Sequence, residues 1–241
     1  MIDHVTIRVS ELEASKRFYD TVLPTLGLEI HSSSFGHEWG DFSLSQATPE
    51  KPVTRRLHVG FRAPSREHVD AFWRAGIDAG YVDDGEPGPR PQYSPSYYGG
   101  FLLDPDGNSA EAVSHDEPRA SIDHVWIRVS DVEASKRFYD AVSAQTGFPL
   151  HHEREQQATF VGSGGSFTVV AGEPTENLHM AFSAEENETV DAFHRAALDA
   201  GYRDNGAPGE RAIYHPGYYG AFVLDPDGNN IEVVNHNRPP G

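Results

Sequence analysis

The chain alternates short segments of period-two hydrophobicity with longer amphipathic segments. Residues 4–9 and 57–61 place apolar side chains at every second position. Because successive side chains point to opposite faces of a strand, each segment predicts a strand with one buried face. Residues 12–26 and 65–79 instead carry apolar residues at roughly helical spacing. Strand-like pieces follow each helix, so the pattern of strand, helix and about three strands occurs twice per half.

The ends of the predicted helices carry recognisable signals. Ser10 followed by Glu13, and Ser130 followed by Glu133, match a capping box, so we expect these serines to cap helices. Pro64 and Ser65 precede the second predicted helix. Gly27 and Gly80 stand where the two helices of the first half should end.

The chain is a tandem duplication. Residues 2–20 return almost unchanged as residues 122–140, and FLLDPDGNSAEAV (101–113) returns as FVLDPDGNNIEVV (222–234). A short polar joint, residues 114–121, separates the copies, as a linker should. We therefore predict two domains, 1–118 and 119–241. Strands followed by helices with few long crossovers predict an α+β class, with mixed but mostly antiparallel sheets.

Each copy places two histidines and one glutamate on the non-core faces of its strands. The turn sequence DPDG predicts a hairpin with glycine at positive φ, which sets Phe101 opposite Glu111 and Phe222 opposite Glu232. A lone histidine or glutamate on a strand usually just faces solvent. Here the three recur together, whereas we set His31, His37 and His115 aside as histidines without a counterpart. Two histidines and a carboxylate suit a divalent transition metal and leave positions open for substrate. The candidate ligands are His4, His58, Glu111, His124, His179 and Glu232.

Composition narrows the class of protein. Without cysteine, disulfides, thiolate metal sites and cysteine nucleophiles are excluded. The net charge of −18 argues against nucleic acid and anionic membranes as partners. No apolar run reaches membrane-spanning length, and no signal peptide is evident, so we expect a soluble cytoplasmic protein.

The paired modules, IDHVxIRVS, LHV and FxLDPDGNxxE resemble the vicinal oxygen chelate superfamily. That family includes glyoxalase I, bleomycin-resistance proteins, fosfomycin-resistance enzymes, methylmalonyl-CoA epimerase and extradiol dioxygenases. The resemblance covers nearly the whole chain. It implies pairs of βαβββ modules, in tandem glyoxalase-like domains whose sheets curl into cups around metal sites. It also implies the six ligands named above and a divalent cofactor, Fe²⁺, Mn²⁺, Ni²⁺ or Zn²⁺.

The chain departs from several relatives at the expected site. Glyoxalase I and the epimerase use four protein ligands, but the corresponding strands here offer only Ser43, Ser45 or Thr168. Extradiol dioxygenases have a catalytic tyrosine ten residues before the glutamate, where this chain has Phe101 and Phe222. The potassium-site loop of fosfomycin-resistance enzymes is not found. The resemblance therefore implies the fold and superfamily but does not assign the reaction.

Further residues of the predicted cup are candidates for substrate contact. The tyrosine-rich segments 91–100 and 212–221 predict either a rim over the cup or an ordinary packed loop. Arg8 and Arg128 would hold an anionic substrate or pair with a carboxylate across the sheet. Thr6 against Trp126 indicates that the cups differ in shape, and His215, which replaces Ser94, is a candidate general base in one site. The substrate-binding candidates are Arg8, Tyr98, Phe101, Trp126, Arg128, Tyr219 and Phe222.

We expect a metal-dependent enzyme that acts on a small oxygen-chelating substrate, by lyase, isomerase or iron(II) oxygenase chemistry. The alternative is a metal-free protein that sequesters an aromatic or antibiotic molecule, as bleomycin-resistance proteins do. The chain would act as a monomer with internal pseudo-twofold symmetry or as a homodimer. Each cup could combine modules of one half or exchange them between halves. Both arrangements give complete ligand sets, and we favour exchange, since the connection 46–55 is long enough for a crossing.

Overall fold

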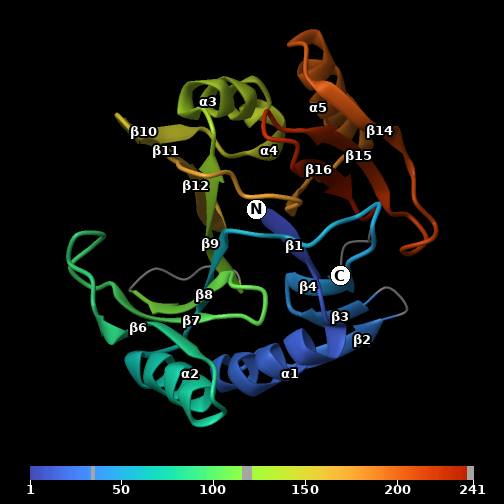
Figure 1. The fold of residues 1–241 in the computed structure, drawn as a ribbon. Helices are drawn as coiled ribbons and strands as arrows, with labels where there is room; N and C mark the ends of the chain where they lie inside the picture. The colour runs from blue at the N-terminus through green and yellow to red at the C-terminus, as the bar shows by residue number, and fades with distance from the viewer. Residues whose placement is uncertain (34–35, 116–120, 238–241) are drawn as a thin grey trace.

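A computed structural model of the chain describes residues 1–33, 36–115 and 121–237. Its elements form four modules of one pattern, a strand, a helical segment and three strands (Figure 1). The first module comprises β1 (Ile2–Val9), α1 (Leu12–Val22), η1 (Leu23–Leu26), β2 (Ile30–Ser33), β3 (Gly36–Trp39) and β4 (Phe42–Gln46). The second comprises β5 (Leu57–Arg62), α2 (Arg66–Asp78), β6 (Val82–Pro89), β7 (Tyr98–Leu103) and β8 (Ser109–Ser114).

The second half of the chain repeats this order. The third module comprises β9 (Ile122–Val129), α3 (Val132–Ala141), α4 (Ser143–Thr146), β10 (Leu150–Arg154), β11 (Gln157–Gly162) and β12 (Gly165–Ala171). The fourth comprises β13 (His179–Ser183), α5 (Asn187–Asp199), β14 (Arg203–Glu210), β15 (Tyr219–Leu224) and β16 (Asn230–Asn235). Pairing is parallel between the first and last strand of each module and antiparallel elsewhere, which confirms the α+β class with mixed sheets.

The modules are exchanged between the halves. One eight-stranded sheet has the order β14-β15-β16-β13-β1-β4-β3-β2, and the other β10-β11-β12-β9-β5-β8-β7-β6. Antiparallel pairs β1 with β13 and β5 with β9 join modules from different halves. The favoured exchange is therefore confirmed, and each sheet contains one module of either half. The division of the chain into domains 1–118 and 119–241 stays a prediction.

Helices and aromatic residues connect the two modules of each half, on the side of the sheets that the apolar strand faces cover. In Figure 1, α1 and α2 lie side by side at the bottom of the molecule, while α3, α4 and α5 lie at the top. Phe42 of β4 meets Phe61 of β5 edge to face at 5.1 Å, and Phe148 packs against Phe182 of β13 at 5.0 Å. The predicted apolar faces are buried as expected, Val5 and Val125 among them. Within the described residues, no helix is long and apolar enough to cross a membrane.

The repeated DPDG sequence forms the predicted turn. Gly107 has φ 81° and Gly228 φ 89°, so both adopt the left-handed conformation that only glycine takes without strain. The backbone N–H of Gly107 donates to the carbonyl of Asp104 at 2.9 Å, which closes the turn. The hairpins then pair Phe101 with Glu111 and Phe222 with Glu232, as predicted.

The predicted capping boxes are wrong. Helix α1 is preceded by Glu11 in the N-cap position, and α3 by Asp131, whose carboxylate accepts from the backbone N–H of Ala134. Ser10 and Ser130 lie one residue too early, and their backbone N–H groups donate to the turn carboxylates of Asp106 and Asp227. The serines therefore tie each first helix to the DPDG turn of its own half.

Candidate metal centres

Strand register brings the candidate ligands together across three neighbouring strands. His4 of β1 pairs with Ala181 of β13, and Ala181 pairs with Glu232 of β16. His179 lies two residues before Ala181 on β13 and so shares its face. A small residue between two ligands leaves the space in which their side chains converge. We call the group of His4, His179 and Glu232 the His4 site.

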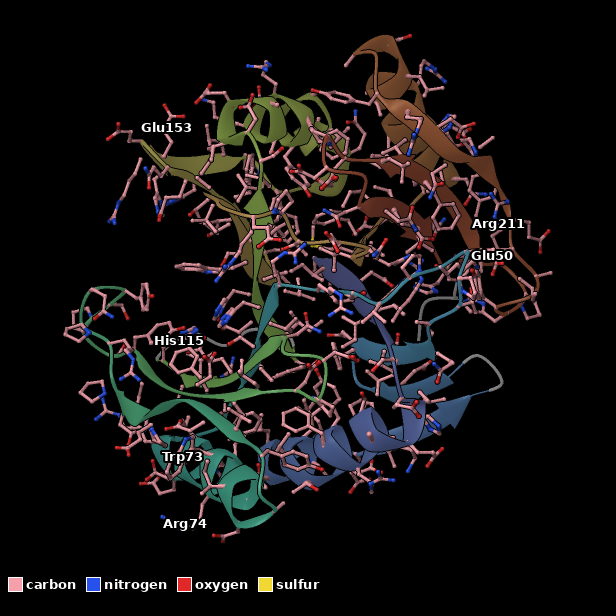
Figure 2. All side chains as sticks on the ribbon, in the orientation of Figure 1. Glu50, Trp73, Arg74, His115, Glu153 and Arg211 are labelled. Atoms are coloured by element: carbon pink, nitrogen blue, oxygen red, sulfur yellow. The ribbon has the colours of Figure 1, made fainter. Side chains whose placement is uncertain are left out.

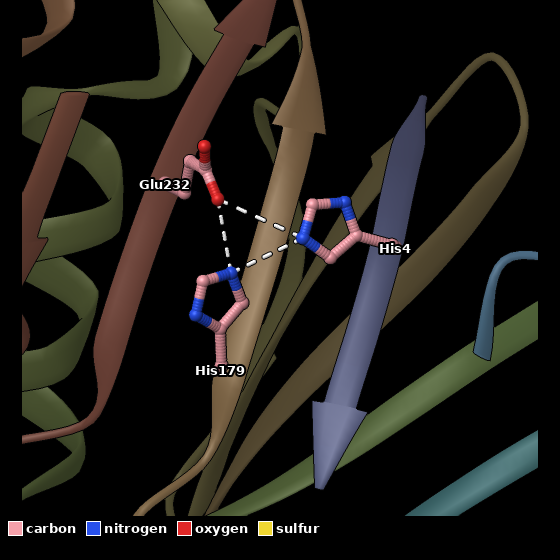
Figure 3. Close-up of side chains that lie close together, drawn as sticks. All are labelled: His4, His179 and Glu232. Carbon is pink, nitrogen blue, oxygen red and sulfur yellow. Dashed lines mark hydrogen bonds and ion pairs between the residues drawn. The ribbon is translucent and has the colours of Figure 1, made fainter. Parts of the chain in front are cut away.

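Figure 3 shows the three side chains of the His4 site pointing toward one another. Nε2 of His179 lies 2.9 Å from Oε2 of Glu232 and 3.2 Å from Nε2 of His4. Nε2 of His4 lies 3.6 Å from the same glutamate oxygen. Glu232 is fully buried, whereas both histidines remain partly open toward the cavity in front of them.

The second group, His58 of β5, Glu111 of β8 and His124 of β9, repeats this arrangement, and we call it the His124 site. Nε2 of His58 lies 3.0 Å from Oε2 of Glu111 and 3.1 Å from Nε2 of His124. Nε2 of His124 lies 3.2 Å from the same glutamate oxygen. Each site thus takes one histidine from one half and the other two residues from the other half.

The donor atoms fit a metal ion bound on one face. Three ligands about 2.1 Å from an ion and at right angles to one another lie about 3.0 Å apart. The separations in the His124 site, 3.0 to 3.2 Å, match this arrangement, and those in the His4 site spread from 2.9 to 3.6 Å. Within the described residues, each group contains three ligands and no fourth histidine or carboxylate.

Hydrogen bonds on the far side of the ring orient the Nε2 atoms of three of the four histidines, whereas Nδ1 of His179 lies 2.7 Å from the side-chain nitrogen of Asn230. Nδ1 of His4 lies 2.8 Å from Oδ1 of Asp3, and Nδ1 of His124 lies 2.9 Å from Oδ2 of Asp123. Nδ1 of His58 lies 3.1 Å from the hydroxyl of Ser109. A proton on Nδ1 leaves the Nε2 lone pair directed at the site, which is how carboxylates support histidine ligands of metals. Sequence analysis missed both aspartates, although each directly precedes its histidine.

The tyrosine that reaches each site is not the one predicted. The hydroxyl of Tyr97 donates to Oε1 of Glu111 at 2.8 Å, and Tyr218 donates likewise to Glu232 at 2.7 Å. The next residue in each copy points out of the site, where its hydroxyl donates to a helix carboxylate, Tyr98 to Asp70 and Tyr219 to Asp191. The structure therefore does not bring Tyr98 or Tyr219 into the site, because neighbouring strand residues face opposite sides.

A further histidine stands behind each aspartate. Nε2 of His115 lies 2.6 Å from Oδ1 of Asp123, and Nε2 of His236 lies 3.0 Å from Oδ2 of Asp3. Figure 2 labels His115. Setting His115 aside as unmatched was wrong, because His236 follows it at the same 121-residue offset that relates Phe101 to Phe222. His31 was also wrongly set aside, since His151 follows it at the 120-residue offset that relates residues 2–20 to 122–140. Asp3 and Asp123 thus each bridge two histidines.

His215, the predicted base, extends only one of these two hydrogen-bonded series of histidine and aspartate, the one in the His4 site. Its Nε2 lies 2.8 Å from Nδ1 of His236, so His215, His236, Asp3 and His4 form one connected series. The counterpart of His215 in the other half is Ser94. Within the part of the chain that the structure describes, the hydrogen-bonded series in the His124 site therefore runs from His124 through Asp123 to His115.

The electrostatics of the His124 site favour a cation among its carboxylates. Burial raises the pKa of Glu111, but hydrogen bonds with His124 and His58 outweigh it and hold that pKa at about 2. Burial lowers the pKa of His124, yet Asp123 and Glu111 together raise it to about 10. In the His4 site, burial lowers the pKa of His179, whereas Asp3 and Glu232 overcome burial and raise that of His4. In the metal-free protein, a proton on His124 or His4 thus supplies the positive charge that a metal ion would bring to these carboxylates.

Each site opens into a cavity, and different predicted substrate-binding residues line the two cavities. The cavity at the His124 site has a volume of about 540 Å³ and includes Phe101, Trp126 and Arg128 in its wall. The cavity at the His4 site, about 980 Å³, includes Arg8 and His215. Phe222 is nearly buried and, among the described residues, is not part of that wall. The side chain of Arg8 donates a hydrogen bond to the carbonyl of Asn177 at 3.4 Å.

Comparison with known proteins agrees with this architecture. The family model of the Glyoxalase/Bleomycin resistance protein/Dioxygenase superfamily matches residues 1–112 and again residues 121–233. The chain belongs to this superfamily, as a tandem duplication of its domain. No curated protein sequence matches the chain.

Two solved structures share the fold across the whole chain. Glyoxalase I from Zea mays is 18% identical, with a TM-score of 0.69 over 98% of this chain and 92% of that chain. A candidate dioxygenase from Bacillus subtilis subsp. subtilis str. 168 is 13% identical, with a TM-score of 0.67 over 100% of this chain and 86% of that chain. At these identities the likeness is one of fold.

Proposed function

We propose that the chain is a divalent-metal-dependent enzyme with two metal centres, His4–His179–Glu232 and His58–Glu111–His124. The observation that carries the proposal is the convergence of two imidazole nitrogens and one carboxylate oxygen within 3.0 to 3.2 Å in the His124 site. Ligands on a single face leave the opposite face for a substrate that chelates through neighbouring oxygens. Fe²⁺, Mn²⁺, Ni²⁺ and Zn²⁺ all accept this donor set.

Of the chemistries compatible with this donor set, iron(II) oxygenase chemistry is the best supported. Two histidines and one carboxylate on one face, with the other positions open, is the ligand pattern of non-haem iron(II) oxygenases. A bound metal would polarise the substrate oxygens, and iron(II) would in addition supply redox chemistry in which the electrons pass from the chelated substrate to dioxygen. Tyr97 and Tyr218 would fix the carboxylate ligands, since each donates to the glutamate oxygen that faces away from the histidines.

A lyase or isomerase reaction is the second candidate, and the His4 site carries the observation that favours it. Such a reaction needs a base that can take a proton from the substrate. His215 lies in the cavity wall, where its Nδ1 donates to the carbonyl of Pro216 at 2.8 Å and its Nε2 lies 2.8 Å from Nδ1 of His236. These bonds hold the ring, and Nε2 would take the substrate proton on leaving His236. With Ser94 at the equivalent position, the His124 site lacks this histidine.

Metal analysis separates these proposals from simple sequestration of a small molecule. Protein treated with EDTA and titrated anaerobically with Fe²⁺, Mn²⁺, Ni²⁺ or Zn²⁺ should bind two equivalents per chain. Oxygen consumption by the iron-loaded protein with chelating substrates would support the oxygenase. Failure of every metal to bind with at least about micromolar affinity, roughly −8 kcal/mol, would leave sequestration as the function.

A further inference from the structure

The cavities in front of the two proposed metal centres are lined by different side chains. Trp126 stands two residues beyond His124 on β9, and the equivalent residue beyond His4 on β1 is Thr6. The hydroxyl of Thr6 pairs with that of Ser43 at 2.7 Å, so this part of the His4 cavity is polar. The indole therefore adds an aromatic face to the wall of the His124 cavity at a position where the His4 cavity has a hydroxyl, while Tyr214, the counterpart of Tyr93, lines the His4 cavity.

Other rings extend this wall around the His124 site. The ring of Tyr93 meets Trp126 edge to face at 5.9 Å, and the ring of His58 lies 6.0 Å from Trp126 and 5.9 Å from Phe101. Tyr93 is 51% exposed, so much of its ring is open to a ligand. Aromatic faces around a cavity favour a flat, unsaturated ligand, because stacked and edge-to-face contacts between rings contribute more than the burial of their area alone.

Charge also distinguishes the cavities, in a chain whose net charge is −18. The described charged residues lining the His124 cavity are Arg56, Arg90, Arg128, Asp84 and Glu111. Those lining the His4 cavity are Arg8, Lys51, Asp3, Glu38, Asp41 and Glu232, with the N-terminus of Met1. Arginines outnumber carboxylates in the first, whereas carboxylates outnumber basic side chains in the second.

The arginines of the His124 cavity differ in their availability. Arg56 is paired with Glu173 and Glu176. Arg90 lies over the ring of Phe101 at 5.3 Å and donates to backbone carbonyls. Arg128 is exposed and, among the described residues, has no carboxylate within ion-pair distance. A guanidinium of this kind binds carboxylate or phosphate oxygens through paired N–H donors.

We propose that the His124 cavity binds a planar aromatic anion, that the His4 cavity does not, and that Trp126 and Thr6 set this difference. The inference rests on the proposed function, because the aromatic anion would be the substrate class of the metal centre in the same cavity. Its ring would lie against Trp126 and Tyr93, and its acidic group would meet Arg128. The two centres of one chain would then act on different substrates.

Calorimetric titration with 2-naphthoate tests the proposal, on both EDTA-treated and Zn²⁺-loaded protein. We expect one naphthoate per chain. Trp126→Thr, which copies the other cavity, should weaken binding about tenfold, the upper range for an aromatic pair. Trp126→Phe should retain most of the affinity, and the matched control Thr6→Ala should leave it unchanged. Neutral naphthalene-2-carboxamide should bind more weakly than naphthoate, and Arg128→Gln should abolish that preference.

Three results would overturn the proposal: no naphthoate binding at millimolar concentration, undiminished binding by Trp126→Thr, or two equal sites per chain. Thermal unfolding of each variant shows whether a loss comes from misfolding. Metal equivalents are counted on the same samples. A protein that binds metal normally but fails these criteria refutes the cavity assignment alone. One that binds naphthoate as expected but takes up no metal refutes the proposed enzyme instead.

Discussion

Exchange of modules makes a prediction that paired histidine substitutions test directly. In the structure, His4 shares a site with His179, while His58 shares one with His124. Replacing His4 and His179 together should therefore damage one centre and leave the other intact. Replacing His4 and His58 should damage both. If modules of the same half formed each centre, these two outcomes would be reversed.

The size of the expected change follows from the ligand count. Each site holds three described ligands, so every substitution removes a third of its donor set. Loss of a residue that merely supports a ligand costs about 10- to 100-fold in metal affinity, and loss of the ligand itself should cost at least the larger factor, about 2.7 kcal/mol. With free metal held at about ten times the dissociation constant, occupancy of a damaged site falls from about 0.9 to about 0.1.

Equilibrium dialysis against buffered Zn²⁺ or Mn²⁺, followed by elemental analysis, provides the assay. The wild-type chain should retain nearly two equivalents, His4→Ala/His179→Ala nearly one, and His4→Ala/His58→Ala almost none. His151→Ala/His152→Ala is the control, because both side chains are exposed and, among the described residues, neither belongs to a ligand group. One equivalent retained by the His4/His58 variant would refute the assignment of ligands to sites.

Three further predictions concern single residues of the His124 site. A Cβ at Gly60 would overlap Cε1 of His124, so Gly60→Ala should displace that ring and weaken metal binding at this centre. Ala181→Gly, the reciprocal change in the other site, should not, and metal titration of both variants decides. Asp123→Asn should weaken metal binding about 10- to 100-fold at this centre alone, measured by competition with a fluorescent chelator, and equal loss at both centres would contradict it. In metal-free protein, the raised pKa of His124, about 10, predicts stability that is full below pH 6.5 and lost as the pH rises toward 10. The lowered pKa of Glu111, about 2, predicts stability that is full above pH 4.5 and lost toward pH 2. Melting temperatures should show both losses, and His124→Ala should reduce the alkaline one to the part that the raised pKa of His4 contributes.

The faces of the strands could be predicted from the sequence because alternation is a local property. Val5 and Ile7 fix the core side of β1, and His4 must then point the other way. The strand that pairs with β1 was harder to predict, because either way of pairing the modules gives a chemically complete set of ligands. Only strand pairing over more than 170 residues, His4 with Ala181, decides between them.

The residues behind the ligands could not be assigned in this way. Tyr97 and Tyr98 are equivalent by composition, and their roles differ because the strand begins at Tyr98 and turns one ring inward and the other toward α2. The capping boxes failed for a related reason, since the DPDG carboxylates compete for the backbone N–H groups of Ser10 and Ser130. A signal did exist for His115, because the repeat offset leads directly to His236.

Fusion of the two copies explains why the sites can differ. Two identical chains exchanging modules would form two identical sites, and any substitution would appear in both. In one fused chain, each site draws on different residues of the sequence, so a change on β9 alters one cavity only. Trp126 against Thr6, Ser94 against His215 and Gly60 against Ala181 are differences of this kind, set around ligand groups of the same composition. In the function proposed above, the ligands would fix the shared chemistry, and the residues around them would give each cavity its own selectivity.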